Sequence, residues 1–251
     1  MRALIIISAM VMTLTVSAIP VADASFFDET KGWWMDESQW QKFTEGGNDI
    51  GQDGNNLGLS GTGARGYAEY SSNWAFNMDE TVVFSADFYY NPSSPQNRMK
   101  LGLIPTGVID INGVSIGRGD ELMGGSDKAV FYWEVDLGSG LTGDFELNPA
   151  NSGTFLVSYD PGFKEITLSV AGLGLSKTYD LSDMIVSGQM MSVYLGGGSI
   201  LGDTSPFNKS EVYFSNFQLT NGTPTAVPEP VSTTLFLLGG ATLAMRKLRR
   251  K

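Results

Sequence analysis

Two segments of this chain alternate apolar and polar side chains so regularly that few folds remain open to it. Residues 81–90 and residues 129–137 each place apolar side chains at every second position. Successive side chains of a β-strand point to opposite faces, so this spacing predicts strands with one buried face. Further strands are expected at 99–104, 154–159, 163–170, 190–195 and 211–219. Many short strands and little helical periodicity predict a mainly β chain, folded as an antiparallel β-sandwich over residues 25–220.

Turn sequences separate these strands. Asp160-Pro161-Gly162 has the residues that a tight hairpin turn requires, so the segments on either side of it are expected to pair. The glycine-rich residues 172–174 and 196–198 are predicted to be loops.

The segment ahead of the first clear strand is rich in aromatic residues. Residues 33–43 are expected to form a short helix or helical turn, and residues 46–66 to be loop or short strands. Large aromatic side chains in such a domain either complete the core or form a platform for carbohydrate. The tryptophans with these two alternatives are Trp33, Trp34, Trp40 and Trp74.

The chain has neither cysteine nor histidine. Without cysteine, its stability must come from a hydrophobic core and not from disulfides. Without histidine, Ser-His-Asp and Cys-His catalysis are excluded, as are the usual zinc and copper ligand sets. Residues 25–226 hold 10 basic and 25 acidic residues, a formal charge of −15, against −11 for the whole chain. Such a surface repels nucleic acid, so no nucleic-acid partner is expected.

The first 24 residues read as an export signal. Met1-Arg2 forms a short, positively charged N-terminus, and an apolar stretch follows from Ala3 to Ser17. Ala22-Asp23-Ala24 then places small residues at the two positions that a signal peptidase recognises. This order predicts a secretory signal peptide over residues 1–24, with cleavage between Ala24 and Ser25. The alternative is an uncleaved N-terminal anchor.

The C-terminal residues have three parts. Pro228-Glu229-Pro230 forbids regular helix. The apolar run 231–245 would span roughly 22 Å as a helix, less than a hydrocarbon core of about 30 Å. Residues 221–227 are expected to be a linker ahead of this segment. The basic tail, which the positive-inside rule keeps in the cytoplasm, consists of Arg246, Lys247, Arg249, Arg250 and Lys251.

These last 24 residues, 228–251, resemble the PEP-CTERM sorting signal of Gram-negative bacteria. The matching parts are Pro228-Glu229-Pro230, the apolar helix with Gly239-Gly240 inside it, and the basic tail. The resemblance implies processing by an exosortase, a membrane-embedded cysteine-protease-like enzyme, and a bacterium that makes exopolysaccharide and biofilm. It also implies export across the inner membrane, transient anchoring by the C-terminal helix, and release to the cell surface or medium. An ordinary C-terminal tail anchor is the alternative.

The strand pattern of the body resembles concanavalin-type and laminin-G-type jelly rolls. A hairpin over 155–170 is followed, near the end of the body, by a strand over 212–219. The resemblance implies a jelly-roll-like sandwich.

Glu134 and Asp136 resemble the start of the Glu-x-Asp-x-x-Glu or Glu-x-Asp-x-Glu signature of laminarinase-type glycosidases. The two residues point off the same face of an expected strand. The third carboxylate of the signature would stand at position 138 or 139, which are Gly138 and Ser139 here. Retaining hydrolysis needs a nucleophile and a separate acid/base group. We therefore expect no catalytic residues and no enzymatic activity.

Aromatic and acidic residues on the polar sides of two expected strands form a candidate glycan face. If the two strands are neighbours, these side chains make one patch; the alternative is an ordinary solvent-facing surface. The residues of the candidate face are Asp87, Tyr89, Tyr132, Glu134 and Asp136.

Asp49, Asp53 and Asn55 are candidate calcium ligands, because carboxylate and amide oxygens among glycines suit that ion. Their spacing does not match the twelve-residue calcium loop, so a plain surface loop is the alternative. No other cofactor is expected.

Together these features predict an exported, non-enzymatic protein of the surface or extracellular matrix, associated with exopolysaccharide or biofilm. Its expected partners are signal peptidase, an exosortase-like protease and exopolysaccharide. The alternative function is a lectin-like carbohydrate-binding module, with or without calcium.

Overall fold

The computed structural model describes nine stretches of the chain. These are residues 40–54, 56–62, 65–91, 97–106, 113–123, 126–137, 142–199, 206–222 and 225–226. The expected signal peptide with Ala24 and Ser25, the sorting signal 228–251, and Trp33, Trp34 and Asn55 lie outside the described residues. Among the described residues, no helix is long and apolar enough to cross a membrane.

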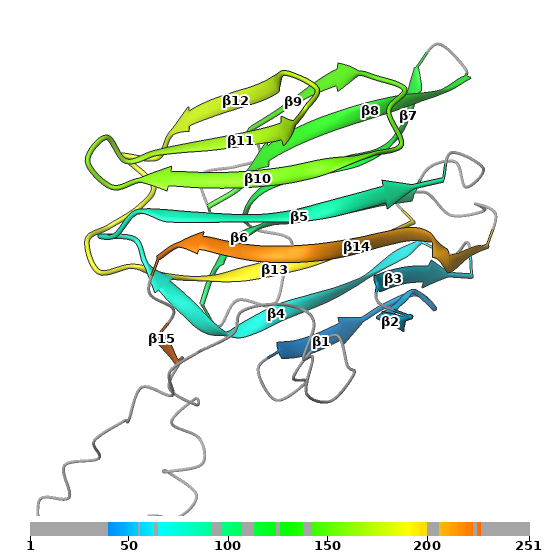
Figure 1. Cartoon of the computed structure of the whole chain (residues 1–251), viewed down its shortest axis with the longest axis horizontal. Coiled ribbons are helices and arrows are strands. Elements are labelled where there is room, and N and C mark those ends of the chain that lie inside the picture. Colours follow the sequence, from blue (N-terminus) through cyan, green and yellow to red (C-terminus); the bar gives the residue numbers. More distant parts are fainter. Residues whose placement is uncertain are drawn as a thin grey trace, which may run out of the picture. The chain divides into compact units, whose positions relative to one another are not determined.

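The described residues form fifteen strands in two antiparallel sheets (Figure 1). The eight-stranded sheet has the order β1 (Trp40–Thr44), β4 (Gly66–Asn77), β13 (Met190–Ser199), β6 (Asn97–Pro105), β7 (Val114–Met123), β8 (Ser126–Val135) and β9 (Thr142–Leu147), and β15 (Thr225–Ala226) also pairs with β4. The seven-stranded sheet has the order β12 (Leu175–Asp180), β11 (Glu165–Ala171), β10 (Ser152–Asp160), β5 (Val82–Tyr90), β14 (Phe207–Asn221), β3 (Asn56–Gly61) and β2 (Asp49–Asp53). The predicted antiparallel β-sandwich is therefore confirmed.

The two sheets enclose one hydrophobic core. In β5 every second residue from Val82 to Tyr90 is buried, as the alternation predicts. Phe88 of β5 packs edge-on against Phe131 of β8, with ring centroids 5.6 Å apart. Because the apolar sides of β5 and β8 meet inside, their polar sides lie on opposite outer surfaces of the sandwich.

The predicted hairpin between β10 and β11 is confirmed. Asp160 pairs with Glu165 at the end of the ladder. The Gly162 amide donates to Asp160 Oδ1 at 2.8 Å, which is the local bond that favours aspartate ahead of a turn. Residues 172–174 form the turn between β11 and β12, also as predicted.

Residues 196–198, predicted to be a loop, lie inside β13. Both neighbouring strands, β4 and β6, pair with them. A Cβ atom on Gly196 would lie 2.7 Å from the carbonyl oxygen of Ala68 in β4. These glycines thus permit a close approach of backbones and do not end the strand.

Two other segments differ from the sequence prediction. Residues 40–43, expected in a helix, belong to β1, where Trp40 packs edge-on against Trp74 with ring centroids 5.6 Å apart. Both tryptophans are buried, so they complete the core. Thr225–Ala226, inside the expected linker, pairs with Trp74 and Ala75 of β4, so this part of the segment is attached to the sheet.

Candidate functional site

Glycines hollow the outer face of the eight-stranded sheet. The register places Gly117 of β7 between Tyr132 of β8 and Lys100 of β6, and Gly196 of β13 beside Lys100. A cavity of about 450 Å³ opens on this face, and the glycines that line it are Gly66, Gly197 and Gly198. We call this cavity the cleft. Its lining consists of Glu45, Arg65, Gly66, Tyr67, Arg98, Lys100, Tyr132, Glu134, Gly197 and Gly198.

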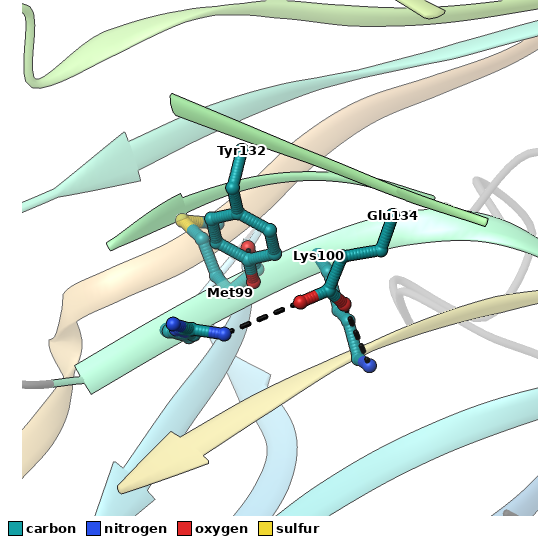
Figure 2. Close-up of polar contacts among 5 residues, drawn as sticks. Met99, Lys100, Tyr132 and Glu134 are labelled. Carbon is teal, nitrogen blue, oxygen red and sulfur yellow. Dashed lines mark hydrogen bonds and ion pairs between the residues drawn. The ribbon is translucent and has the colours of Figure 1, made fainter. Parts of the chain in front are cut away.

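The ring of Tyr132 lies at Gly117 of the neighbouring strand β7. A Cβ atom on Gly117 would stand only 2.2 Å from Cζ of the Tyr132 ring, so the ring occupies the space that the glycine leaves. The Tyr132 hydroxyl donates to the Met99 carbonyl oxygen at 3.0 Å (Figure 2). Burial raises the pKa of Tyr132 well above its usual range, and the Glu134 carboxylate adds to this effect. The hydroxyl therefore stays protonated, and its hydrogen bond to the Met99 carbonyl holds the ring in place.

Glu134 is held between two cations of β6 (Figure 2). Its Oε1 accepts from Arg98 Nη1 at 3.2 Å, and its Oε2 lies 3.8 Å from Lys100 Nζ. The Arg98 guanidinium also stacks near the ring of Tyr132, 4.8 Å from its centroid. Only about a fifth of the Glu134 side chain is exposed. These contacts pre-orient a carboxylate, a guanidinium and an ammonium group at the floor of the cleft.

The other side of the cleft comes from β4 and the turn between β1 and β2. Tyr67 stacks on Phe43 of β1, with ring centroids 5.2 Å apart. The backbone carbonyl of Glu45 accepts a hydrogen bond from the Asn48 amide. The backbone amide of Glu45 donates to the Tyr67 carbonyl at 2.7 Å. The cleft thus combines aromatic rings with charged donors and acceptors, the set that binding sites for polar ligands use.

The structure divides the candidate glycan face between the two outer surfaces. Tyr132 and Glu134 lie in the cleft, and Asp136 follows the end of β8, where its amide donates to the Gly113 carbonyl at 2.8 Å. Asp87 and Tyr89 lie on β5, in the other sheet. The prediction of a single patch is therefore wrong, because the strands belong to opposite layers.

On β5 the two residues have local partners. Asp87 accepts bonds from Thr154 Oγ1 at 2.5 Å and from Asn216 Nδ2 at 3.1 Å. Tyr89 stacks on Tyr213 of β14, with ring centroids 5.0 Å apart. These contacts support the seven-stranded sheet itself.

Of the candidate calcium ligands, Asp49 and Asp53 are not brought together, and Asn55 lies outside the described residues. Asp49 is bound by two lysines, with Oδ1 2.5 Å from Lys42 Nζ and Oδ2 2.8 Å from Lys209 Nζ. Partial burial acts to raise the pKa of Asp49, but the hydrogen bonds and charges of the two lysines outweigh it and lower the pKa. Asp53 stands at the other end of β2, roughly 13 Å along the strand. Among the described residues no group of three or more acidic side chains is placed to hold a metal ion.

Sequence reasoning missed most of the cleft. Arg98 and Lys100 alternate along β6 and so share a face, but nothing in their own segment marks them as partners of Glu134. One usable signal was the glycine run 196–198, because Gly197 and Gly198 line the cleft. Glycine inside a strand indicates a close backbone approach or a hollow in the sheet.

No protein-family model and no curated protein matches the sequence. Solved structures with a similar fold include an endo-glucanase of glycoside hydrolase family 16 from Bacteroides ovatus, in complex with G4G3G-2F-DNP. It is 12% identical, and the match covers 74% of this chain and 96% of that chain with a TM-score of 0.51. The carbohydrate recognition domain of Emp46p, in a potassium-bound form, is 11% identical, with 78% and 92% covered and a TM-score of 0.51. Lectin UEA-II complexed with galactose is 10% identical, with 75% and 93% covered and a TM-score of 0.51. At such low identity the likeness shows a jelly-roll-like fold.

The expectation that the chain is not an enzyme is contradicted. A glycoside hydrolase is among the proteins with this fold, so the sandwich itself is compatible with catalysis. The missing carboxylate at position 138 or 139 was an insufficient reason, since a second acidic residue, Glu45 in the turn after β1, also lines the cleft.

Proposed function

We propose that the protein binds carbohydrate in the cleft. The observation that carries this proposal is the cavity, which Tyr67, Arg98 and Glu134 line with an aromatic ring, charged donors and an acceptor. Sugars present apolar C–H faces and many hydroxyl groups, so they suit a surface that offers both aromatic rings and fixed polar groups. The names of the similar structures, which include a lectin with galactose and a carbohydrate recognition domain, support this proposal.

The test is retention of the purified protein in gels that contain defined polysaccharides. Tyr67→Ala removes a ring of the cleft and should abolish the retardation that wild-type protein shows. Tyr89→Ala is the matched control, because Tyr89 lies on β5 in the other sheet and stacks on Tyr213. Equal loss of binding in both variants, or no binding of wild-type protein to any polysaccharide, would contradict the proposal.

Cleavage of the bound glycan is the second candidate function, and the presence of Glu45 and Glu134 in one cleft favours it. Glycoside hydrolysis uses a pair of carboxylic acids that flank the scissile bond. Release of reducing sugar by wild-type protein, lost in both Glu45→Gln and Glu134→Gln, would establish it. Binding without release of sugar would reject it.

We also propose, from the sequence alone, that the protein is exported and sorted through its C-terminal segment. The signal-peptide pattern of residues 1–24 and the PEP-CTERM-like residues 228–251 support this. Mass spectrometry of the mature protein tests it. The expected protein begins near Ser25 and lacks the tail from Arg246 to Lys251, whereas a mature protein that keeps this tail would indicate a stable anchor.

A further inference from the structure

Among the described residues, the two most exposed large apolar side chains lie on loops at one end of the sandwich. Phe163, in the turn between β10 and β11, is 73% exposed, and Val186, in the loop between β12 and β13, is 70% exposed. Their neighbours in the chain are bonded to each other, because Lys164 Nζ donates to the Ile185 carbonyl at 3.3 Å. The two loops are therefore held side by side, and we call the surface around Phe163 and Val186 the apolar end.

β15, the last described strand, lies near the apolar end (Figure 1). Asp79 Oδ2, in the turn that follows β4, accepts from Ser187 Oγ at 3.2 Å and from the Gly188 amide at 3.0 Å. This turn therefore lies beside the loop that carries Val186. β15 ends at Ala226 and pairs with the last part of β4, just ahead of the same turn.

The apolar run 231–245 is close enough along the chain to hold a membrane at the apolar end. Ala226 pairs with Trp74, three residues or about 10 Å along the strand from the end of β4 at Asn77. The run begins five residues after Ala226, and five extended residues span at most about 17 Å. The opposite end of β4, at Gly66, is eight residues or about 26 Å from Trp74. A bilayer that holds the run can therefore contact the apolar end but not the opposite end.

From these positions we propose that the apolar end rests on the lipid bilayer while residues 231–245 anchor the chain, with Phe163 and Val186 among the lipid headgroups. The inference rests on the proposed export and C-terminal sorting, and it adds a surface of the body to them. Two apolar side chains alone bind a bilayer weakly, because binding strength follows the buried apolar area. An anchor on the same chain raises the effective concentration of the apolar end at the membrane to about the millimolar range.

The charges of the apolar end select the kind of headgroup. Its three connections, residues 78–81, 160–164 and 181–189, carry four carboxylates and one cation, which gives a formal charge of −3. Carboxylates are repelled by the negative surface potential of anionic lipids. The surface that fits the apolar end is therefore one of zwitterionic headgroups, such as phosphatidylcholine. The charged residues of the three connections are Asp79, Glu80, Asp160, Asp183 and Lys164.

The experiment measures lipid contact at single labelled positions. The protein without its predicted signal peptide, residues 25–251, is reconstituted in phosphatidylcholine vesicles. Because the chain has no cysteine, Val186→Cys takes one fluorescent label. Lipids with a nitroxide on the headgroup should quench this label. Leu173→Cys is the matched control, since Leu173 is exposed in the turn between β11 and β12, at the opposite end of the sandwich, and its label should stay unquenched.

A second substitution tests whether the apolar side chains cause the contact. Phe163→Ser in the Val186→Cys protein should reduce the quenching, whereas Leu173→Ser in the same protein should not. Both residues are exposed, so the urea midpoint should not change. Replacement of the phosphatidylcholine by phosphatidylglycerol should also reduce the quenching. Equal quenching in both lipids would overturn the selection of zwitterionic headgroups.

Failure of the inference is distinguishable from failure of the proposed anchoring, which flotation of the protein with the vesicles measures. Protein that floats with the vesicles, but whose label at position 186 is quenched no more than that at position 173, would overturn the lipid contact and leave the anchoring intact. Protein that does not float with the vesicles would overturn both.

Discussion

The indole Nε1 of Trp133, in the eight-stranded sheet, donates a 3.0 Å hydrogen bond to the backbone carbonyl of Leu168 in the seven-stranded sheet. This bond joins the two layers directly through the core. Trp133→Phe should lower the free energy of unfolding by about 2–3 kcal/mol, because it removes a buried hydrogen bond and leaves a small cavity. Urea unfolding followed by fluorescence measures the change.

Trp74→Phe is the control for this prediction. Trp74 is also buried, but its Nε1 has no hydrogen-bond partner among the described residues. The substitution therefore removes a similar volume without a bond, and should cost about 1 kcal/mol less than Trp133→Phe. Equal costs would show that the bond to Leu168 contributes nothing to stability.

Arg118→Met should destabilise the fold by about 3 kcal/mol. Arg118 is fully buried in β7, where Nε donates to the Ala150 carbonyl at 2.9 Å and Nη1 donates to the Val130 carbonyl at 3.2 Å. Its guanidinium also packs against the ring of Tyr90. Methionine fills the space but leaves these carbonyls without their donor. Lys128→Met makes the same change of charge at an exposed site and should shift the urea midpoint very little.

Gly117→Ala should displace Tyr132 and disturb the cleft. The new Cβ atom would stand 2.2 Å from the Tyr132 ring and 2.5 Å from the Met99 carbonyl oxygen, so the ring must move. We expect a loss of stability of about 1–3 kcal/mol together with weaker glycan binding. Gly143→Ala, at the edge strand β9, is the control. Its new Cβ atom would meet only the Trp133 carbonyl oxygen, at 3.3 Å, so this substitution should disturb the structure less. Wild-type binding in the Gly117 variant would show that the position of Tyr132 is not needed.

Asp49→Asn should reduce stability at neutral pH, and this effect should shrink as the pH falls below 3.8. The two lysines lower the pKa of folded Asp49 below 3.8, so its stabilising effect is present above that pH and is lost as the pH falls through the folded pKa. The site is partly exposed, so the cost at pH 7 is about 1 kcal/mol or less. Urea midpoints at pH 7 and at a series of pH values below 3.8 measure the difference, and Asp53→Asn on the same strand is the control. A difference that does not shrink as the pH falls below 3.8 would contradict this assignment.

The sequence was sufficient for elements whose side chains alternate cleanly. Residues 82–90 and 126–135 became strands because one face is apolar and the other polar. The same rule failed for β13, where Gly196 interrupts the pattern although both neighbouring strands pair with it. A glycine removes the side-chain signal but not the backbone hydrogen bonds that define a strand.

Most of the cleft was beyond local sequence rules because it depends on pairing. Glu134 meets Arg98 only because β8 lies next to β7 and β7 next to β6. Asp87 looked equivalent to Glu134, yet it lies in the other sheet. Alternation shows which side of a strand is polar, but it carries no information on which strands share a layer.

Phe145→Ala should weaken glycan binding without loss of stability. Phe145 is 56% exposed on the edge strand β9, and the register places it beside Tyr132, on the side of the sheet that carries the cleft. An exposed ring at that place extends the aromatic surface of the cleft for a longer glycan. Truncation should therefore reduce affinity for long oligosaccharides more than for short ones, and the urea midpoint should not change. Phe163→Ala, an exposed ring in the β10–β11 hairpin of the other sheet, is the matched control. Equal affinities of both variants and the wild type for long chains would restrict the binding surface to the cleft itself.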